Sequence, residues 1–410
     1  MTGKNQMSKH VFEGVKVADF TVGAVGTVAT KYLADHGATV LHVESATAPE
    51  VCRAGPPFRD NKPGLNRSAW MPDYNSNKYG IGLNLRHPRA NEVARRIVAW
   101  ADIVSNNRPA GQMERYGLGY EDIKKIKPDI IMFVSCMQGH TGPHREHPGY
   151  GTQLAALSGF THLSGWPDRL PSEIWLAYTD FICPRYIGAT LIAALDYRRR
   201  TGKGQFLDFS QFEMGIQFIA PLLLDYTVNG RIANRRGNDS SCGAPHGAYP
   251  CRGEDRWCAI AVFTDEEWES LCRVIGNPEW TNDPRFSTLV GRLQNKDELD
   301  RFLGEWTINF TAEEVMTLMQ AAGVSAGVLE TNEDLHNDPQ LKHRRHFWIM
   351  DHREIGPMAH DGEAFILSKT PYELRWAGPC LGEHNEYVYT EILGMSEKEF
   401  DELLVEGVFE

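Results

Sequence analysis

The sequence has no run of apolar residues near the roughly 20 that a membrane-spanning helix needs, so we expect no membrane association. Its first residues are polar and contain neither an apolar signal core nor a small-residue cleavage site. The composition is otherwise ordinary for a globular protein, with 42% hydrophobic and 23% charged residues. We therefore expect a soluble protein of the cytoplasm.

Basic residues are in deficit, and paired cysteines are missing. The formal net charge of -12 argues against a nucleic-acid partner, because proteins that bind nucleic acids need a basic surface. The eight cysteines are scattered without a CxxC pair. That pattern is typical of reduced thiols and indicates neither a disulfide framework nor a zinc site.

Several common active-site motifs are also absent. The first predicted strand is followed by Gly23 and Gly26, but no GxGxxG brings the backbone against a dinucleotide, which argues against NAD. No GxxxxGK[ST], GxSxG or HExxH occurs either. These absences argue against phosphoryl transfer, serine hydrolysis and zinc proteolysis, and we expect neither a metal nor a tightly bound cofactor.

What the sequence does contain is a repeated alternation of strand and helix patterns. Apolar segments typical of buried strands alternate with helical spacing, and a chain of 410 residues favours two domains. This alternation predicts an α/β fold with a parallel sheet and helices on both faces. The expected strands cover residues 15–20, 39–44, 81–85, 103–105, 130–135 and 205–209, with helices at 29–36, 88–100, 186–200 and 211–226.

The second part of the chain changes character. Residues 229–247 are polar and contain glycine, which indicates a linker and loop. Residues 249–330 then predict a smaller α+β domain, with a strand at 258–262 and three helices. From residue 335 the tail is expected to be rich in loops, with helices only near 385–393 and 397–404.

Residues 178–211 hold the carboxylate that we consider the best catalytic candidate, Asp180. It precedes an apolar helix and the turn Thr-Gly-Lys-Gly-Gln. A carboxylate with a reference pKa of about 3.9 is ionised at neutral pH and can attack a carbonyl carbon without a general base. The local sequence alone favours a helix N-cap, which is the commoner role for an aspartate ahead of a helix.

Several segments, in this order and over nearly the whole chain, resemble the class III CoA-transferases, the family of formyl-CoA transferase and carnitine CoA-transferase. They include GVKVADF, YLADHGATVLHVES, NSNKYGIGLNL, ADIVSNNRPAGQMERYGLGYEDI, GHTGP, the block at 180–205, RRGNDSSCGAPHGAYP and GPCLGEH.

The resemblance implies a fold, an assembly and a reaction. The large domain is Rossmann-like and built from both chain ends, here 1–225 with 335–410, and residues 226–334 form linkers and a small α+β domain. Two subunits interlock like rings. The reaction moves CoA from an acyl-CoA to a free carboxylic acid, and Asp180 aligns with the nucleophilic aspartate. The intermediates are a mixed anhydride and then an aspartyl-CoA thioester; the exchange needs no ATP.

The resemblance also implies binding residues for CoA, which is a substrate here. By alignment the CoA contacts fall on Lys78, on Asn107 or its neighbour Asn106, and on Arg115, with Arg108 beside them. Each residue alone is more typical of a solvated surface, and only the set together favours CoA binding. The chain departs from the formyl-CoA transferase pattern at Ala24, Ser45 and Met137, the last at a lysine position.

A glycine-bearing loop at 240–247, with Gly243 and Gly247, aligns with a loop that covers the acylated aspartate in the family. Backbone N–H groups in such a loop stabilise developing oxyanions. A plain linker turn is the alternative interpretation.

Two alternatives share the fold. The α-methylacyl-CoA racemases use a His-Asp pair, but Tyr150 stands at the histidine position and is a poor base for that task. Some relatives are heteromers in which one chain lacks the nucleophile, so the partner is either a second copy or a similar chain.

For the substrate, Trp166, Trp175, Tyr178 and Phe181 lie close to Asp180 in sequence, and they can line an acid's apolar tail or simply pack in the core. The segments VADFT and KYLADHGATVLHVES resemble the benzylsuccinate CoA-transferase branch of aromatic degradation. We therefore expect succinyl-CoA as donor and an aromatic acid such as benzylsuccinate as acceptor.

Overall fold

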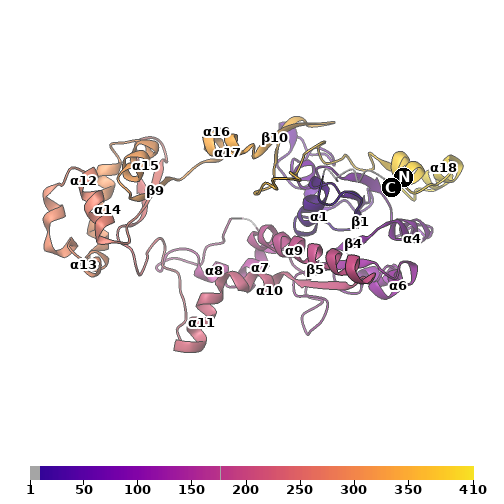
Figure 1. Ribbon diagram of the computed structural model, residues 1–410, viewed down its shortest axis with the longest axis horizontal. Coiled ribbons are helices and arrows are strands. Elements are labelled where there is room, and N and C mark those ends of the chain that lie inside the picture. Colours follow the sequence, from indigo (N-terminus) through magenta and orange to yellow (C-terminus); the bar gives the residue numbers. More distant parts are fainter. Residues whose placement is uncertain (1–9, 176) are drawn as a thin grey trace, which may run out of the picture. The chain divides into compact units, whose positions relative to one another are not determined.

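The computed structural model describes residues 10–175 and 177–410, which form two compact units (Figure 1). Unit 1 contains the chain up to His162, then Ser172–Ala233 and Lys342–Glu410. Unit 2 contains Leu163–Pro171 and Asn234–Leu341. The chain therefore passes between the units four times.

Unit 1 is built on one sheet of six parallel strands in the order β3-β2-β1-β4-β5-β6. This confirms the predicted parallel α/β architecture. Central strands such as β5 are buried along their whole length, because helices cover both faces of the sheet. The strands are β1 (Lys16–Asp19), β2 (Thr39–Glu44), β3 (Tyr79–Gly82), β4 (Ile103–Asn106), β5 (Ile131–Cys136) and β6 (Phe206–Ser210).

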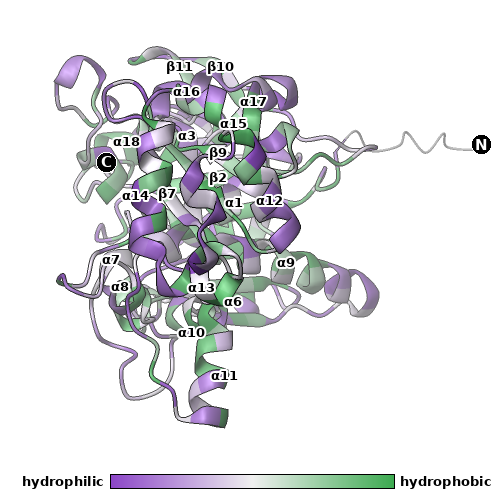
Figure 2. Ribbon diagram, turned by 90° about the vertical axis from the view of Figure 1, so that its left-hand side faces the viewer, coloured by the Kyte–Doolittle hydropathy of each residue, from purple (hydrophilic) through white to green (hydrophobic). Residues whose placement is uncertain are grey.

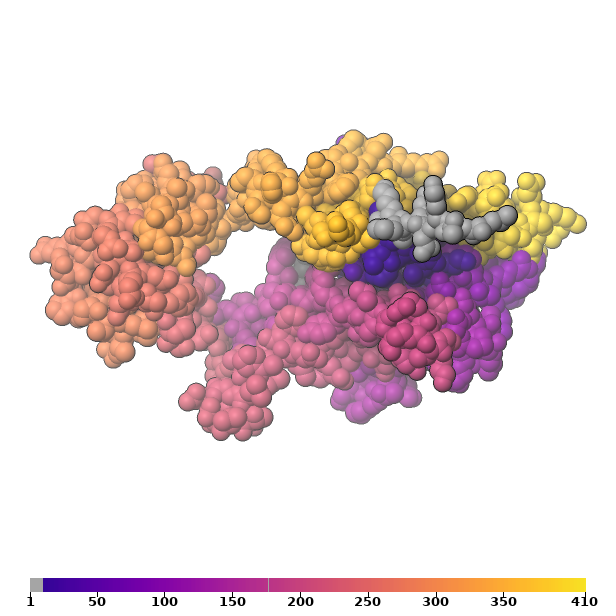
Figure 3. Space-filling model, in the orientation of Figure 1, coloured from indigo at the N-terminus to yellow at the C-terminus, as the bar shows by residue number. Residues whose placement is uncertain are grey.

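Two apolar cores lie on the two faces of this sheet. One is formed with α1 (Val25–Asp35) and α9 (Tyr178–Thr201), and the other with α4 (Ala90–Trp100), α6 (Tyr120–Ile126) and α18 (Glu397–Val405). The second core joins Val388, Tyr389 and Phe409 to residues of β1 and β2, so both ends of the chain share it. Figure 3 shows the yellow C-terminal residues packed along the indigo and purple ones.

Two of the expected helices are not continuous α-helices in the structure. The helix expected at 211–226 is divided into α10 (Gln211–Ile216), a 3₁₀ turn η2 (Gln217–Ile219) and α11 (Ala220–Asn229), which begins with a proline at its first turn. The helix expected near 385–393 is a π-helix, η5 (Tyr387–Ile392).

The tail expected to be rich in loops instead contains regular structure: α16 (Asn332–Asn337), α17 (Pro339–Arg344) and the hairpin β10 (Phe347–His352) with β11 (Gly356–Asp361). Its Gly356-Pro357 pair begins a strand instead of breaking one, which a hairpin edge permits.

Unit 2 has a three-stranded antiparallel sheet of β7 (His246–Pro250), β8 (Trp257–Ala261) and β9 (Ser325–Val328). Cys258 and Ile260 of β8 belong to a core, whereas the intervening Ala259 is exposed on the other face. The remaining helices of this unit are α12 (Asp265–Val274), η3 (Glu279–Asn282), η4 (Pro284–Phe286), α13 (Leu289–Gln294), α14 (Lys296–Thr307) and α15 (Ala312–Ala321).

The short elements of unit 1 lie mostly in its loops: α2 (Val51–Ala54), η1 (Arg59–Asn61), α3 (Trp70–Tyr74), α5 (Gln112–Arg115), α7 (Gly151–Leu157) and α8 (Phe160–Leu163). Within the described residues, no helix is both long enough and apolar enough to cross a lipid bilayer.

Candidate active site

A cavity of about 480 Å³ opens in unit 1 beyond the carboxyl ends of β1, β4, β5 and β6. The strand order reverses between β1 and β4, and ligands of open parallel sheets bind at such a point. The turn after β1 supplies Val22–Val25, and β6 is followed by Gln211. The other lining residues are Val51, Cys52, Trp70, Tyr74, Asn107, Arg108, Pro109, Gln112, Cys136, Met137, Arg145, His147, Pro148, Gly149, Tyr150, Gly151, Thr152, Leu154, Ala177, Asp180 and Phe181.

The wall formed by the turn after β1 is held by side chains. Asn107 accepts a hydrogen bond from the Val22 N–H at 2.8 Å and donates one to the Val22 carbonyl. The Gly23 N–H donates to the Glu50 carboxyl at 2.6 Å, and burial together with the Glu44 charge raises the pKa of Glu50 to about 7. This wall is therefore fixed before any ligand binds.

Asp180 lies in the first turn of α9. The helix begins at Tyr178, and its N-cap residue is Ala177, which provides no side-chain cap. The N-cap interpretation of Asp180 is therefore wrong. Apolar spacing through Cys183, Ile187 and Leu191 seats the helix on the sheet, which fixes the position of the carboxyl group.

Gly151, the first residue of α7, lies directly against this carboxyl group. A Cβ atom built on Gly151 would lie 2.5 Å from Asp180 Oδ1 and would also overlap Ala177. Only glycine at this position leaves room for the carboxylate. No sequence motif indicates this role of Gly151, since a glycine ahead of a helix does not reveal what it faces.

The electrostatic environment of Asp180 differs from the expectation. None of the hydrogen bonds formed among residues 10–175 and 177–410 ends on its carboxylate, and burial raises its pKa to about 7. Protonated Asp180 is therefore populated near neutral pH, whereas we expected full ionisation. Two nearby thiols stay neutral: burial and the Asp180 charge raise the pKa of Cys183 to about 12 and that of Cys52 still further.

Arg108 brings an uncompensated positive charge to the cavity. Its side chain is half-buried, its Nε atom is shielded from solvent without a hydrogen-bond partner, and no ion pair to it forms in the described part of the chain. Burial lowers its pKa. The fully buried Arg53, in contrast, binds the Glu44 carboxylate through two nitrogens. A buried cation without a counter-ion is costly, so Arg108 marks a position where an anion would be stabilised.

The sequence matches the CoA-transferase family III over residues 12–385. The chain belongs to this family. It is similar to a succinyl-CoA–D-citramalate CoA-transferase of Chloroflexus aurantiacus, with 30% identity over 395 residues, or 96% of each chain. It is 29% identical to the mouse succinyl-CoA:glutarate CoA-transferase, over 100% of this chain and 93% of the relative.

The fold agrees. A crystal structure of a CAIB/BAIF family protein from Brucella suis superposes with a TM-score of 0.86 at 29% identity, covering 94% of this chain and 100% of that one. The family membership that the sequence resemblance implied is thus confirmed, and the protein is a class III CoA-transferase.

Within this class III CoA-transferase, the structure brings Asn107, Arg108, Met137 and Tyr150 to the Asp180 cavity. Asn106 lies immediately behind, fully buried, with its side-chain oxygen accepting from the Arg108 N–H at 3.2 Å and its amide nitrogen without a partner. The predicted CoA contacts at the end of β4 are therefore adjacent to the cavity.

Lys78 and Arg115, which the family alignment also indicates as CoA contacts, do not line this cavity. The Lys78 ammonium is fully buried and has four protein partners: the Asp19 carboxylate at 3.0 Å, the Thr27 carbonyl, the Thr30 hydroxyl and the Asn75 side chain. A buried lysine with all its donors occupied is not available to a phosphate. Arg115 ends α5 and is not part of the cavity lining.

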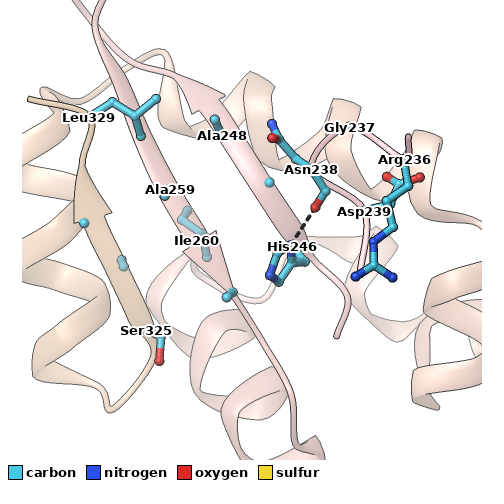
Figure 4. Close-up of a pocket in the computed structure, with 14 residues that line it drawn as sticks. Arg236, Gly237, Asn238, Asp239, His246, Ala248, Ala259, Ile260, Ser325 and Leu329 are labelled. Carbon is cyan, nitrogen blue, oxygen red and sulfur yellow. Dashed lines mark hydrogen bonds between the residues drawn. The ribbon is translucent and has the colours of Figure 1, made fainter. Parts of the chain in front are cut away.

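The two predicted loop glycines, Gly243 and Gly247, belong to unit 2. Gly247 lines a separate cavity of about 690 Å³ on the open face of the sheet, where His246 Nδ1 lies 2.6 Å from the Asn238 carbonyl (Figure 4). Gly243 is buried against Phe263.

Of the four aromatic residues expected near Asp180, only Phe181 lines its cavity, and Trp70 and Tyr74 join it there. Trp166 belongs to unit 2, where its ring packs on Gly237, and Tyr178 packs on Phe160. Trp175 is 85% exposed.

Two further polar side chains that line the cavity, Arg145 and His147, are not among the predicted site residues. Both lie in the segment after β5 that contains the family sequence GHTGP. The only sequence feature that indicates these two residues is the excess of basic and imidazole side chains in GHTGPHREHPG. Such an excess is also common in solvated loops.

Proposed function

We propose that this enzyme transfers CoA from succinyl-CoA to a free dicarboxylic acid through covalent intermediates on Asp180. The observation that carries the proposal is the position of Asp180: it is the one carboxyl group among the lining residues of the cavity, and it has no competing hydrogen bond among the described residues. The relatives that act on D-citramalate and on glutarate support succinyl-CoA and a dicarboxylic acid as the substrate pair.

The chemistry proceeds through deprotonated Asp180. The carboxylate attacks the thioester carbonyl of succinyl-CoA, the C–S bond breaks, and a mixed succinyl-aspartyl anhydride and the CoA thiolate result. The thiolate attacks the aspartyl carbonyl, which releases succinate and leaves an aspartyl-CoA thioester. The acceptor carboxylate then repeats these steps in reverse and leaves as its CoA ester. A thioester is exchanged for a thioester, so no nucleotide is consumed.

For CoA binding we propose Asn106, Asn107 and Arg108 at the end of β4, with Met137 beside them, and Arg115 at the end of the following helix. The uncompensated charge of Arg108 supports an anionic ligand at this position. Lys78 is left out of the proposal because its ammonium is fully occupied.

For the acceptor we propose a dicarboxylic acid with a bulky or aromatic substituent, such as benzylsuccinate. The side chains of Trp70, Tyr74 and Phe181 line the cavity and provide an aromatic surface for an apolar group. A strict preference for short aliphatic acids in an acceptor panel would contradict this choice.

For the assembly we propose two interlocked subunits, each with a large domain from both chain ends (1–225 with 335–410) and a small domain within 226–334. The helix α11 supports an additional interface, because none of its residues is buried and its exposed side chains include Leu224, Tyr226 and Val228. The ribbon of α11 is partly green in Figure 2, the colour of hydrophobic residues. The role of the loop with Gly243 and Gly247, covering the acylated aspartate, rests on the family resemblance.

Mass spectrometry of the enzyme mixed with succinyl-CoA tests the proposal. We expect a succinyl or CoA adduct on the peptide that contains Asp180 and its absence in Asp180→Asn. Asp196→Asn, an exposed aspartate on the same helix, is the control and should react as the wild type. Turnover by Asp180→Asn would show that Asp180 is not the nucleophile. Incorporation of deuterium at the α-carbon of an α-methylacyl-CoA would instead favour the racemase alternative.

A further inference from the structure

The segment 138–148, which we call the basic loop, leaves the sheet after β5 and returns to the same place before α7. Its two flanking residues touch: a Cβ atom on Gly149 would lie 2.5 Å from the Met137 sulfur atom. Near its start, the His140 N–H donates to both carboxylate oxygens of Asp208 on β6, at 2.9 and 3.1 Å. The two ends of the basic loop thus lie together at the cavity and are held there by contacts with the rest of unit 1. Surface loops with binding roles often take this form.

The basic loop carries four cationic or imidazole side chains and one acidic residue, Glu146. Two of the four, Arg145 and His147, line the Asp180 cavity. Arg145 forms an ion pair with Glu146 at 3.2 Å, in which both side chains are more than half exposed. Such an exposed pair is weak, so a carboxylate in the cavity can compete for the Arg145 guanidinium.

The loop leads directly to the nucleophile. It is followed by Tyr150 and by Gly151, whose backbone contacts the Asp180 carboxyl group. His147 precedes Gly151 by four residues, so the two Cα atoms are at most about 14 Å apart. Arg108, the other lining arginine, comes from the end of β4, where the proposed CoA contacts lie.

The cavity lining contains more basic and imidazole side chains than carboxyl groups. Arg108, Arg145 and His147 line it together with a single carboxyl group, Asp180, and that group becomes uncharged when it is acylated. A monocarboxylic substrate would use its one carboxylate in the reaction and leave Arg145 to solvent. A dicarboxylic substrate has a second carboxylate, and the planar guanidinium fork is suited to bind it.

We infer that Arg145 and His147 hold the second, non-reacting carboxylate of a dicarboxylic acid while the first carboxyl group reacts at Asp180. The inference rests on the proposed function and specifies its substrate class. It applies to both partners of the exchange, because a succinyl group on CoA also ends in a free carboxylate.

Two acyl-CoA donors, one with and one without a terminal carboxylate, can test the contact of Arg145 and His147 with that carboxylate. Succinyl-CoA and butyryl-CoA carry acyl chains of equal carbon number, and only the first ends in a carboxylate. The measurement is the second-order rate of adduct formation on Asp180, followed by mass spectrometry of quenched samples. Arg145→Gln should lower the rate with succinyl-CoA about 10- to 100-fold and leave the rate with butyryl-CoA within about twofold of the wild type. His147→Gln should act in the same direction.

Arg145→Lys keeps the charge without the fork and should fall between Arg145→Gln and the wild type. Arg199→Gln, an exposed arginine of α9 that pairs with Asp196, is the control and should change neither rate. The affinity for free CoA should be the same in all variants.

Equal losses with both donors would overturn the inference, since they would place Arg145 against the CoA moiety; unchanged rates with both donors would overturn it as well. A wild type that forms no adduct with any acyl-CoA would instead refute the proposed function. Pentanoate and glutarate provide the same comparison for the acceptor.

Discussion

At the scale of single residues, the protonation of Asp180 controls the proposed reaction. Burial raises the pKa of this carboxyl group to about 7, and only the deprotonated form attacks a thioester. We expect the rate of adduct formation to rise about tenfold per pH unit below this value and to level off above it. Rapid-quench rates over a pH series test this, with Asp196→Asn as a variant that should keep the profile. A rate that stays constant below the pKa would contradict it.

Gly151 leads to a second prediction at this scale. In Gly151→Ala the new methyl group would meet Asp180 Oδ1 at 2.5 Å and would also overlap Ala177, so the carboxyl group must move. A displacement of about 1 Å costs roughly 100-fold in reactivity. We expect a loss of that order in kcat, measured at a pH above the pKa of Asp180.

The matched control for Gly151→Ala is Gly188→Ala, on the same helix as Asp180. A Cβ atom there would lie 3.5 Å from Tyr32, which is an ordinary contact, and alanine favours the helix. Its activity should equal that of the wild type. Full activity in Gly151→Ala would show that the site tolerates the methyl group.

At the scale of secondary-structure elements, the periodic segments could be predicted and the junctions could not. The strands near 39–44 and 130–135 and helix α4 agree with their predicted positions because each buries a regular apolar pattern. Helix α9 begins eight residues earlier than expected, since Ala177 is not a residue type that signals a start.

The same distinction holds for the site. The sequence indicated Asp180 and the residues at the end of β4, because these lie in motifs of the family. It could not show that Lys78 points into the protein or that Gly151 contacts Asp180, since both facts depend on packing between segments far apart in the chain.

The buried Lys78 joins β1, α1 and β3, and its replacement should therefore affect stability and not CoA binding. Although burial opposes ionisation, the Lys78 ammonium and the His42 imidazole hold the pKa of Asp19 well below its usual range. Lys78→Ala leaves this carboxylate without its main counter-ion. We expect a loss of about 3–5 kcal/mol in the free energy of unfolding, measured by urea denaturation.

Lys125→Ala, which removes an exposed ion pair with Asp122, is the control for Lys78→Ala and should change stability by less than about 1 kcal/mol. If Lys78→Ala kept its stability but bound CoA more weakly, the lysine would be a CoA contact, as the family alignment suggested.

At the scale of the whole molecule, helix α11 lacks the burial that stabilises a helix when only one chain is present. None of its residues is buried, and Leu224, Tyr226 and Val228 are each more than half exposed. A helix with so little packing is not stable alone in water, and a monomer rarely exposes such an apolar patch. A second chain that covers α11 is consistent with the proposed interlocked assembly.

Leu224 and Val228 are four residues apart and lie on one face of α11. If the wild type forms the proposed dimer, the double variant Leu224→Asp with Val228→Asp should be a monomer in size-exclusion chromatography with light scattering, since two buried carboxylates cost more than an interface of ordinary size can offset. Val405→Asp, at an exposed apolar residue of α18, should leave the mass unchanged. A wild type that elutes as an active monomer would refute the interlocked assembly. A complex with a second, similar chain from the same cells would replace the homodimer with a heteromer and leave the role of α11 intact.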